Sequence, residues 1–429
     1  MTRPPSADLP PAAPSRLRRD LGLLDAVGVG FGAIIGAGIF VVTGVAAGIA
    51  GPAMIAGLVF AGAAATCNAL SSAQLAAEYP QSGGTYEYGY RVLSPWAGYV
   101  AGWMFLASKI SAAGAVALGL AAYVDPLLPG LSPRGIAVAA ILCFTALNYF
   151  GVKRSSRVNL IIVAVSLSSL LVFVGAGVPA FDASNFRPFA PAGWRGGMEA
   201  AAILFFAYTG YARIATLGEE VREPRRTIPR ATIITIVSAL LLYLGVAVIA
   251  VGAVGADRLA GTGAPLRVAA DALPLSWVAT VVSVGGVTAM LGVILSQILG
   301  LSRMAFAMAA RRDLPAMLDK VHANWGVPGR AVLVIGVIAA VVAATGTLRG
   351  VASAASFTIL VYYGIANVAA FKMPREAKLF PDAVPIAGVT ACALLALSLS
   401  RGVILTGLAV LAAGVLVRVL ARHFARHRT

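Results

Sequence analysis

The sequence predicts an all-α integral membrane protein with twelve transmembrane helices. Three observations support this prediction. Of the 429 residues, 59% are hydrophobic and only 12% are charged, whereas apolar residues make up roughly 45–50% of a typical soluble domain. The apolar residues are gathered into long runs separated by short polar segments. Lys and Arg are unevenly distributed among those polar segments.

Each apolar run is close to the length of about 20 residues that a helix needs to cross a bilayer core of ~30 Å. In chain order, the predicted spans are 23–48, 52–78, 96–124, 134–151, 157–178, 196–218, 230–254, 275–305, 329–346, 350–371, 384–400 and 402–421. The segments between them are too short to hold a soluble domain. We therefore expect the protein to act in or across the membrane.

The Lys and Arg residues predict the orientation of the chain. With twelve spans, most of the 33 Lys and Arg residues fall on the side of the two termini. The exceptions are Lys109 and Arg213 inside spans, and in the opposite loops Arg134, Arg187, Arg195, Arg258, Arg267, Arg349 and Arg401. This excess predicts that both termini are cytoplasmic, with residues 1–20 a disordered tail, residues 423–429 a second tail, and the protein in the inner membrane. The net charge of +16 then implies no nucleic-acid partner.

Motifs of enzymes and cofactor sites are missing from the sequence. It contains no His-Glu-x-x-His, no Gly-x-Ser-x-Gly and no Walker motif. A loose dinucleotide pattern at 28–33 lies inside a predicted span, where the strand and helix that this motif requires are lacking. Cys67, Cys143 and Cys392 all fall in apolar spans, which predicts buried, unreactive thiols. We expect no enzyme, cofactor or metal site.

Glycines cluster in the middle of the first predicted span, in GAIIGAGIF at 32–40. Gly28, Gly32 and Gly36 recur every four residues, which is typical of a smooth helix face against which a neighbour packs. Gly38 falls off that face, and together with Gly36 it weakens a helix by roughly 2 kcal/mol relative to alanine. Unwinding inside a membrane is tolerated only in a protein interior or a polar cavity. The glycines therefore predict that Gly36 and Gly38 open the helix at a functional site.

A second interruption is predicted at Thr209 and Gly210 in the sixth span. Broken helices five spans apart indicate an inverted repeat whose substrate binds between the half-helices. The repeats would be residues 21–178 and 179–372, followed by two additional helices in 373–422. Half-helix N-termini offer N–H groups to a carboxylate, and freed carbonyls at the other interruption accept from an ammonium. The pair predicts a site for a zwitterion.

Four segments resemble the amino acid–polyamine–organocation superfamily, particularly bacterial relatives of the cationic amino acid transporters. They are GAIIGAGIF, YPQSGGTYEYGYRVLSP at 79–95, FFAYTGYARIATLGEEVREPRRTIPRA at 205–231 and SRMAFAMAARRDLPAMLDKVHANWGVPGRAV at 302–332. The resemblance implies a leucine-transporter-like fold with a five-plus-five inverted repeat and two C-terminal helices. It also implies transport by alternating access.

The resemblance further implies roles for individual residues. Backbone groups that would face the substrate carboxylate belong to Gly36, Ala37, Gly38 and Ile39. Carbonyls that would accept from its amine belong to Phe206, Ala207 and Thr209. Tyr208 and Tyr211 would be a gate or a pocket wall, with ordinary packing as the alternative. A cytoplasmic gate would use Glu219, Glu220, Arg225 and Arg226, with a solvated charge run as the alternative.

Coupling to an ion is the least determined feature. Some proton-coupled relatives carry a lysine in the fifth helix. The resemblance aligns Ser166 with that position, so this sequence departs from them there and coupling by a lysine at that position is not available. Lys109 lies halfway along the third span, where a charge costs ~2.5–3.5 kcal/mol on insertion scales and the headgroups are too distant for snorkelling. It is therefore a coupling candidate. Ser296 in the eighth span is another, with helix–helix hydrogen bonding as the alternative.

These residues together predict a secondary-active transporter of an amino acid, with proton coupling favoured. Lys109 without an acidic neighbour disfavours a dibasic substrate, so neutral amino acids come first and acidic ones second. An uncoupled amino acid exchanger is the alternative, and a membrane sensor with a transporter fold is less favoured. The amino acid and membrane lipid are the expected partners, and the sequence leaves the oligomeric state open.

Overall fold

The computed structural model describes residues 20–79, 83–127, 130–151, 156–215, 217 and 220–426. The predicted tail at 1–20 lies, apart from its last residue, outside the described residues, as do Glu219 and the end of the second predicted tail. The described elements are helices. They are α1 (Leu23–Ile34), α2 (Ala37–Ala50), α3 (Met54–Glu78), α4 (Thr85–Tyr88), α5 (Pro95–Val124), α6 (Pro133–Tyr149), α7 (Ser156–Gly177), α8 (Gly193–Leu204), α9 (Ala212–Ala215), α10 (Pro224–Ala260), α11 (Pro265–Asp271), α12 (Trp277–Ala310), α13 (Gly329–Thr345), α14 (Leu348–Phe371), α15 (Ala383–Ser398) and α16 (Arg401–Arg426).

Shorter helical pieces complete the described chain. One of them, η6 (Phe205–Tyr211), is a 3-10 segment that joins α8 to α9, and η2 (Gly89–Leu93) is a π-helical turn. The remaining 3-10 turns are Gly51–Ala53, Asp125–Leu127, Val178–Ala180, Ala183–Phe186, Ala316–Leu318 and Arg375–Ala377. The all-α prediction is confirmed for the described residues.

Helices occupy every range in which a span was predicted. Seven described helical stretches are long and apolar enough to cross a membrane, namely Gly38–Glu78, Pro95–Val124, Val158–Ala180, Pro224–Ala260, Trp277–Ala310, Leu348–Phe371 and Arg401–His423. Shorter apolar helices are Leu23–Ile34, Pro133–Tyr149, Gly329–Thr345 and Ala383–Ser398. The prediction of a multi-pass helical membrane protein agrees with these lengths.

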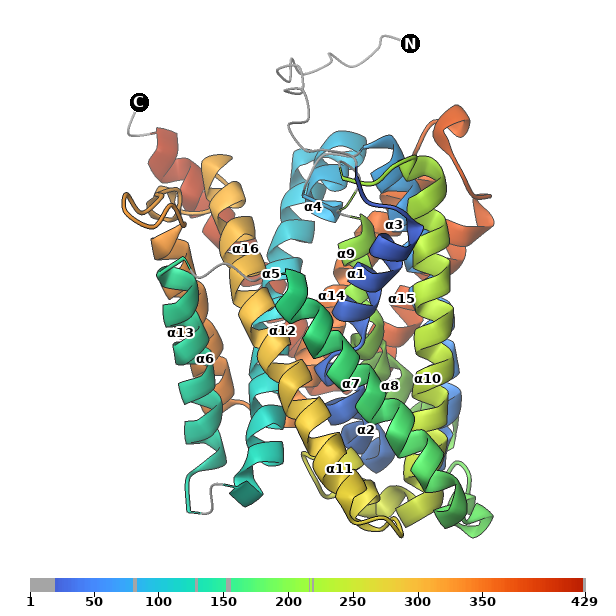
Figure 1. The fold of residues 1–429 in the computed structure, drawn as a ribbon. Coiled ribbons are helices and arrows are strands. Elements are labelled where there is room, and N and C mark those ends of the chain that lie inside the picture. The colour runs from blue at the N-terminus through green and yellow to red at the C-terminus, as the bar shows by residue number, and fades with distance from the viewer. Residues whose placement is uncertain are drawn as a thin grey trace.

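The two interrupted helices lie in the middle of the bundle (Figure 1). In that view α1 and α9 are in the upper half, whereas α2 and α8 are in the lower half, and α1 packs on α9 as α2 packs on α8. The helices α3 and α10 pack together on one flank, and α6 and α13 pack together on the other. The surrounding helices therefore enclose both interruptions.

Cys143 corrects one prediction from the sequence. Its side chain is exposed, whereas Cys392 is buried and Cys67 is partly buried, and all three thiols are free. The reason is the position of α6 at the flank of the bundle, where one face of the helix is left without a protein neighbour (Figure 1). An apolar face toward lipid and an apolar face toward protein look alike in the sequence.

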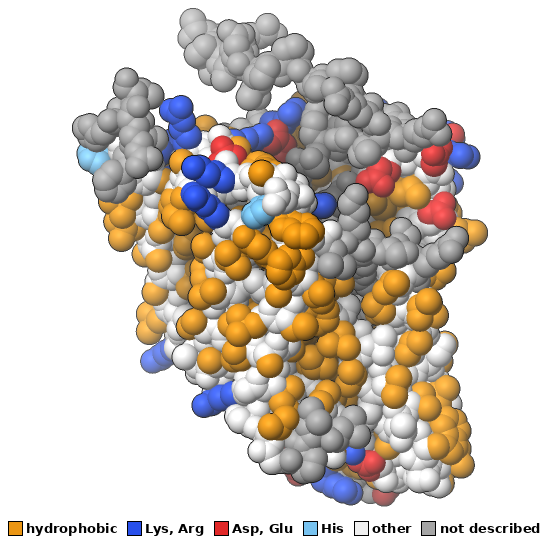
Figure 2. Space-filling view, turned by 60° about the vertical axis from the view of Figure 1, so that its left-hand side comes forward, with side chains coloured by type: hydrophobic (Ala, Val, Ile, Leu, Met, Phe, Trp, Pro, Cys, Tyr) orange, Lys and Arg blue, Asp and Glu red, His pale blue; other side chains and the backbone are white. Residues whose placement is uncertain are grey.

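Charged side chains concentrate at the end of the bundle where α1 begins and α3 and α16 end, which we call the basic end; its residues include Arg91, Arg225, Arg311, Arg418 and Arg422. Figure 2 shows blue Lys and Arg side chains gathered at the top, above a broad orange band of hydrophobic side chains. Such a band is what the hydrocarbon core of a membrane would contact.

A buried ion pair joins α16 to the rest of the basic end. The Arg418 guanidinium lies 3.1 Å from the Asp313 carboxylate, and both side chains are fully buried. Tyr90 in η2 donates a hydrogen bond to the same carboxylate. Burial, together with this hydrogen bond, raises the pKa of the Tyr90 hydroxyl to about 12. The last helix is therefore anchored by polar contacts as well as by apolar packing.

Candidate functional site

The first interruption is two residues long. The helix α1 ends at Ile34, Ile35 has φ −75° and ψ 84°, and Gly36 is extended with φ −139° and ψ −155°. Gly38 is already inside α2, which corrects the prediction that both glycines open the helix. In the first turn of α2, backbone N–H groups have no intrahelical acceptor. The site that the sequence placed at residues 36–39 is therefore a helix N-terminus in the middle of the bundle.

The second interruption has another form. The helix α8 ends at Leu204, and the chain continues as the seven-residue 3-10 segment η6 before α9. Thr209 and Gly210 lie inside η6, so the helix tightens here and does not unwind as predicted. A 3-10 segment retains i to i+3 hydrogen bonds. Most of its carbonyls are therefore not freed by the change of helix type alone.

The two half-helices that flank the first interruption touch the second interruption backbone to backbone. A Cβ atom on Gly38 would lie 2.6 Å from the Cα of Ala207, and one on Gly210 would lie 2.0 Å from the carbonyl oxygen of Ala33. Both distances are far below a van der Waals contact. A glycine therefore lies at each of the two points where the helices flanking the first interruption meet η6.

Gly32 and Gly28 of the first span differ in how closely a neighbouring helix approaches them. A Cβ on Gly32 would meet Val163 and Asn159 of α7 at 2.9 and 3.0 Å, as expected for a packing glycine. A Cβ on Gly28 would meet no atom of another described segment within 4 Å. The prediction of a continuous glycine face is therefore wrong at Gly28, because α7 approaches α1 at Gly32.

Two tyrosines that the sequence analysis did not select hold the interruptions. The Tyr243 hydroxyl of α10 donates to the Ile34 carbonyl at 2.7 Å and lies 3.4 Å from the Ala207 carbonyl. The Tyr363 hydroxyl of α14 donates to the Thr209 carbonyl at 3.2 Å. Both residues could have been selected from the sequence as tyrosines inside apolar spans, because a buried tyrosine hydroxyl needs a hydrogen-bond partner. The sequence analysis assigned carbonyls of the second interruption to the substrate amine. These tyrosine hydroxyls occupy part of the hydrogen-bonding capacity of those carbonyls.

Tyr208 and Tyr211, the predicted gate or wall, are both buried. Tyr208 donates to the Leu58 carbonyl of α3 at 3.3 Å. The ring of Tyr211 lies 5.0 Å from that of Tyr363. Phe206 is 9% exposed and Thr209 is 6% exposed, and every residue of the second interruption except the partly buried Gly210 is buried.

Lys109 reaches the second interruption from α5. Its Nζ atom donates to the Thr209 hydroxyl at 3.3 Å, and that hydroxyl donates to the Phe206 carbonyl at 3.0 Å. The ammonium also lies 6.0 Å from the centre of the Phe105 ring. Among the described residues Lys109 forms no ion pair. A positive charge is therefore attached to the site without a neighbouring carboxylate.

The serines considered for coupling are bonded to backbone carbonyls. Ser166 donates to Ile162 at 2.8 Å and lies 3.3 Å from the Gly285 carbonyl of α12. Ser296 donates within its own helix, to Gly292 at 2.9 Å, with the Val293 carbonyl at 3.1 Å. Ser166 thus reaches a neighbouring helix, whereas the contacts of Ser296 stay within α12 and differ from the helix–helix hydrogen bonding given as its alternative role.

The residues predicted for a cytoplasmic gate separate into different contacts. Arg225 pairs with Glu78 at the end of α3, at 3.2 Å, and Arg226 pairs with Glu223 at 3.6 Å. The Glu220 carbonyl accepts a hydrogen bond from the Leu21 N–H at 3.1 Å. The start of α1 and the segment after α9 are thereby tied to each other at the basic end.

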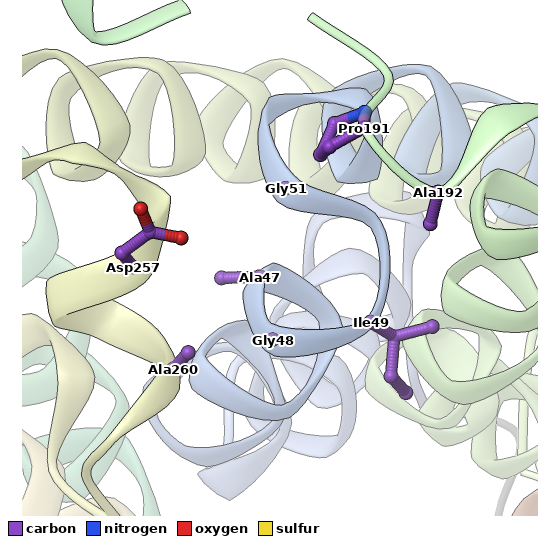
Figure 3. Close-up of a pocket in the computed structure, with 8 residues that line it drawn as sticks. All are labelled: Ala47, Gly48, Ile49, Gly51, Pro191, Ala192, Asp257 and Ala260. Atoms are coloured by element: carbon purple, nitrogen blue, oxygen red, sulfur yellow. The ribbon is translucent and has the colours of Figure 1, made fainter. Parts of the chain in front are cut away.

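A cavity of about 340 Å³ lies at the opposite end of the bundle, away from both interruptions. Figure 3 shows it between the end of α2, the turn at Pro191 and the end of α10. Its lining is mostly small and apolar, with the carboxylate of Asp257 at one side. This cavity contains none of the residues that the sequence assigned to the substrate.

Comparison with known proteins identifies the family. Residues 21–419 match the family model described as amino acid permease. The chain is 44% identical over 404 residues to an uncharacterized transporter of Mycobacterium tuberculosis, which covers 94% of this chain and 91% of the relative. It is 30% identical to the branched-chain amino acid permease of Bacillus subtilis, covering 87% and 84%. It is 31% identical to the methylthioribose transporter of that organism, covering 88% and 87%. The chain belongs to the amino acid permease family.

Proposed function

We propose that this protein is a secondary-active transporter that moves an amino acid across the cytoplasmic membrane by alternating access. The observation that carries the proposal is the pair of glycine contacts between the interruptions. Because Gly38 lies against Ala207 and Gly210 against Ala33, the N-terminus of α2 is next to the carbonyls of η6. Donors for a carboxylate and acceptors for an ammonium thus lie side by side.

Binding through these backbone groups would select the zwitterionic end of the substrate. The first-turn N–H groups of α2 and the positive end of its dipole favour a carboxylate. The ammonium would donate to the Phe206, Ala207 and Thr209 carbonyls in place of the hydroxyls of Thr209, Tyr243 and Tyr363 that lie against them in this structure. One relative is named for methylthioribose, which is why the substrate class is proposed from the site and not from the family alone.

Lys109 is the proposed coupling residue. Its ammonium bonds to Thr209, so a change in its protonation would alter the charge at the second interruption directly. A positive group there disfavours a dibasic substrate, and we propose a neutral amino acid. Uncoupled exchange is the second candidate, since Ser166 and Ser296 are bonded to carbonyls and offer no evident ion ligand.

The proposed membrane arrangement follows the sequence prediction. Twelve spans would result if the interrupted pairs α1–α2 and α8–α9 each cross once, and the shorter helices α6, α13 and α15 cross as well. Repeats at 21–178 and 179–372 would be followed by α15 and α16. The basic end would face the cytoplasm. Accessibility of single cysteines placed at the basic end and at Asp257 to impermeant reagents tests this orientation.

The decisive experiment is binding and uptake by the purified full chain. A substrate that binds the native state raises apparent thermal stability, so each amino acid is compared with its methyl ester and its decarboxylated amine. We expect stabilisation by the amino acid alone. Binding that is equally strong for the ester would contradict the carboxylate site.

Reconstituted Lys109→Ala tests coupling. We expect it to lose accumulation driven by a pH gradient while retaining counterflow, and Lys109→Arg to keep its charge but lose pH dependence. Lys372→Ala, at an exposed position after α14, is the matched control. Full pH-driven accumulation by Lys109→Ala would exclude this residue from coupling, and wild-type protein that stalls without internal substrate would favour the exchanger.

A further inference from the structure

Buried polar side chains from three helices form a cluster beside the second interruption. We call this cluster the polar seam; it consists of Asn68, Ser71 and Gln74 of α3, Asn367 of α14 and Cys392 of α15. The first four are 0% exposed and Cys392 is 3% exposed. The three helices pack against one another. On α3 the polar residues recur every three positions and therefore lie along one side of the helix.

One end of the polar seam contacts the substrate site proposed above. The Asn367 amide donates to the Asn68 side-chain oxygen at 2.6 Å and to the Tyr363 carbonyl at 2.9 Å. Tyr363 in turn donates to the Thr209 carbonyl, and its ring packs on Tyr211. Side chains of α3 and α14 are thus bonded in series to the second interruption.

The other end of the polar seam reaches the basic end. Gln74 lies one turn before the end of α3 and accepts from the backbone N–H groups of Leu379 and Phe380, both at 3.3 Å. Glu78, the last residue of α3, pairs with Arg225. The polar side chains of α3 therefore extend from the middle of the bundle to its charged surface.

Unpaired polar atoms are concentrated in this region. Ten buried side-chain nitrogen or oxygen atoms of the described residues have no hydrogen-bond partner, and five of them are here. They are Asn68 Nδ2, Ser71 Oγ, Gln74 Nε2, Asn367 Oδ1 and the Tyr211 hydroxyl. Each would cost roughly 1–3 kcal/mol if left dry. The group includes amide donors, an amide acceptor and two hydroxyls that can do both, which is the mixture that water satisfies.

We propose that the polar seam binds a file of water molecules that connects the second interruption to the basic end. Waters bonded to Tyr211 and Asn367 would meet those on Asn68 and Ser71, and the file would continue to Gln74. It supplies the partners that the protein atoms lack. If Lys109 exchanges a proton as proposed, the same file provides the route by which that proton reaches the basic end, and only this use of the water depends on the proposed function.

X-ray radiolytic labelling of the purified full chain in ¹⁸O-water tests the proposal, because radicals form at bound water even where bulk solvent is excluded. Tyr123 is the matched control, since it is 0% exposed and its hydroxyl is paired with the Phe40 carbonyl at 3.0 Å. We expect Tyr211 to be oxidised several-fold faster than Tyr123. Equal rates at the two tyrosines would overturn the proposal.

A pair of serine variants provides an independent test. Ser71→Ala removes an unpaired hydroxyl, whereas Ser72→Ala removes one that donates to the Asn68 carbonyl at 2.9 Å. With water bound, Ser71→Ala slows labelling of Tyr211 and lowers the melting temperature, and Ser72→Ala leaves the labelling unchanged. In a dry cluster Ser71→Ala would leave the labelling unchanged and would not destabilise the protein, which would refute the file. Neither readout requires transport, so failure of the Lys109 experiment would be seen separately.

Discussion

The first interruption comprises only Ile35 and Gly36, whereas the second is the seven-residue segment η6. In the first, an extended glycine separates two regular helices and leaves N–H groups at the start of α2. In the second, the chain stays helical. The Tyr363 hydroxyl of α14 donates to its Thr209 carbonyl, and the Tyr243 hydroxyl of α10, which donates to Ile34, lies 3.4 Å from its Ala207 carbonyl. The local backbone conformation at Gly36 is thus enough to expose N–H donors at the start of α2. The accepting carbonyls of η6 depend in addition on tyrosines from distant helices.

Gly210→Ala should have the largest effect, because the contact between the interruptions is tightest there. The new Cβ would lie 2.0 Å from the Ala33 carbonyl oxygen, and backbone cannot move aside as a flexible side chain can. Overpacking costs about 1–3 kcal/mol or more, so we expect uptake to be lost. Gly28→Ala, with no neighbour within 4 Å, should transport normally. Normal uptake by Gly210→Ala would show that the two interruptions need not touch.

Gly38→Ala tests the same contact from the first interruption. Its Cβ would lie 2.6 Å from the Cα of Ala207, which would displace the start of α2 from η6. We expect substrate affinity to fall by about tenfold, equivalent to ~1.4 kcal/mol, whatever the substrate side chain. Substrate-induced thermal shifts measure it, with Gly364→Ala as the control because its new Cβ would meet no atom of another described segment within 4 Å. Unchanged affinity would reduce the glycine motif to simple packing.

Tyr243→Phe separates the two interruptions by removing the hydroxyl that lies between them. A typical hydrogen bond contributes ~1 kcal/mol net, so we expect a loss of about fivefold in affinity and a lower melting temperature. Tyr363→Phe removes only the bond to Thr209 and should be milder. A stronger effect of Tyr363→Phe would mean that the second interruption alone sets the geometry of the site.

Arg349→Gln should have the smallest effect. Arg349 pairs with Glu199 of α8 at 3.1 Å, but the Arg349 side chain is 59% exposed. Exposed pairs contribute about 0–1 kcal/mol, so uptake should change less than fivefold and the change should shrink in high salt. Arg267→Gln, which breaks a 3.8 Å pair with Asp271, is the comparison. If Arg349→Gln reduced uptake more than Tyr243→Phe does, the ion pair at the exposed end of α8 would be more important for the position of this helix than the contacts at its buried end.

Several errors of the sequence analysis have a common origin. Gly28 was expected to pack and does not, Cys143 was expected to be buried and is exposed, and Gly38 lies inside a helix. Each prediction required knowing which neighbour faces the residue. Periodicity gives the face of a helix on which a residue lies, but it does not say whether lipid, another helix or a backbone segment covers that face.

The sequence by itself determined where the helices lie, which two are interrupted, and that Lys109 is an internal charge, because helix formation and membrane insertion depend on local composition. Only the tertiary structure decided that Gly210 meets Ala33, that Tyr243 bonds to Ile34, and that the polar seam gathers residues more than 300 positions apart, Asn68 and Cys392 among them. Buried polar groups can form hydrogen bonds with partners at any distance along the chain. Their partners are fixed by the packing of whole helices, which no local pattern records.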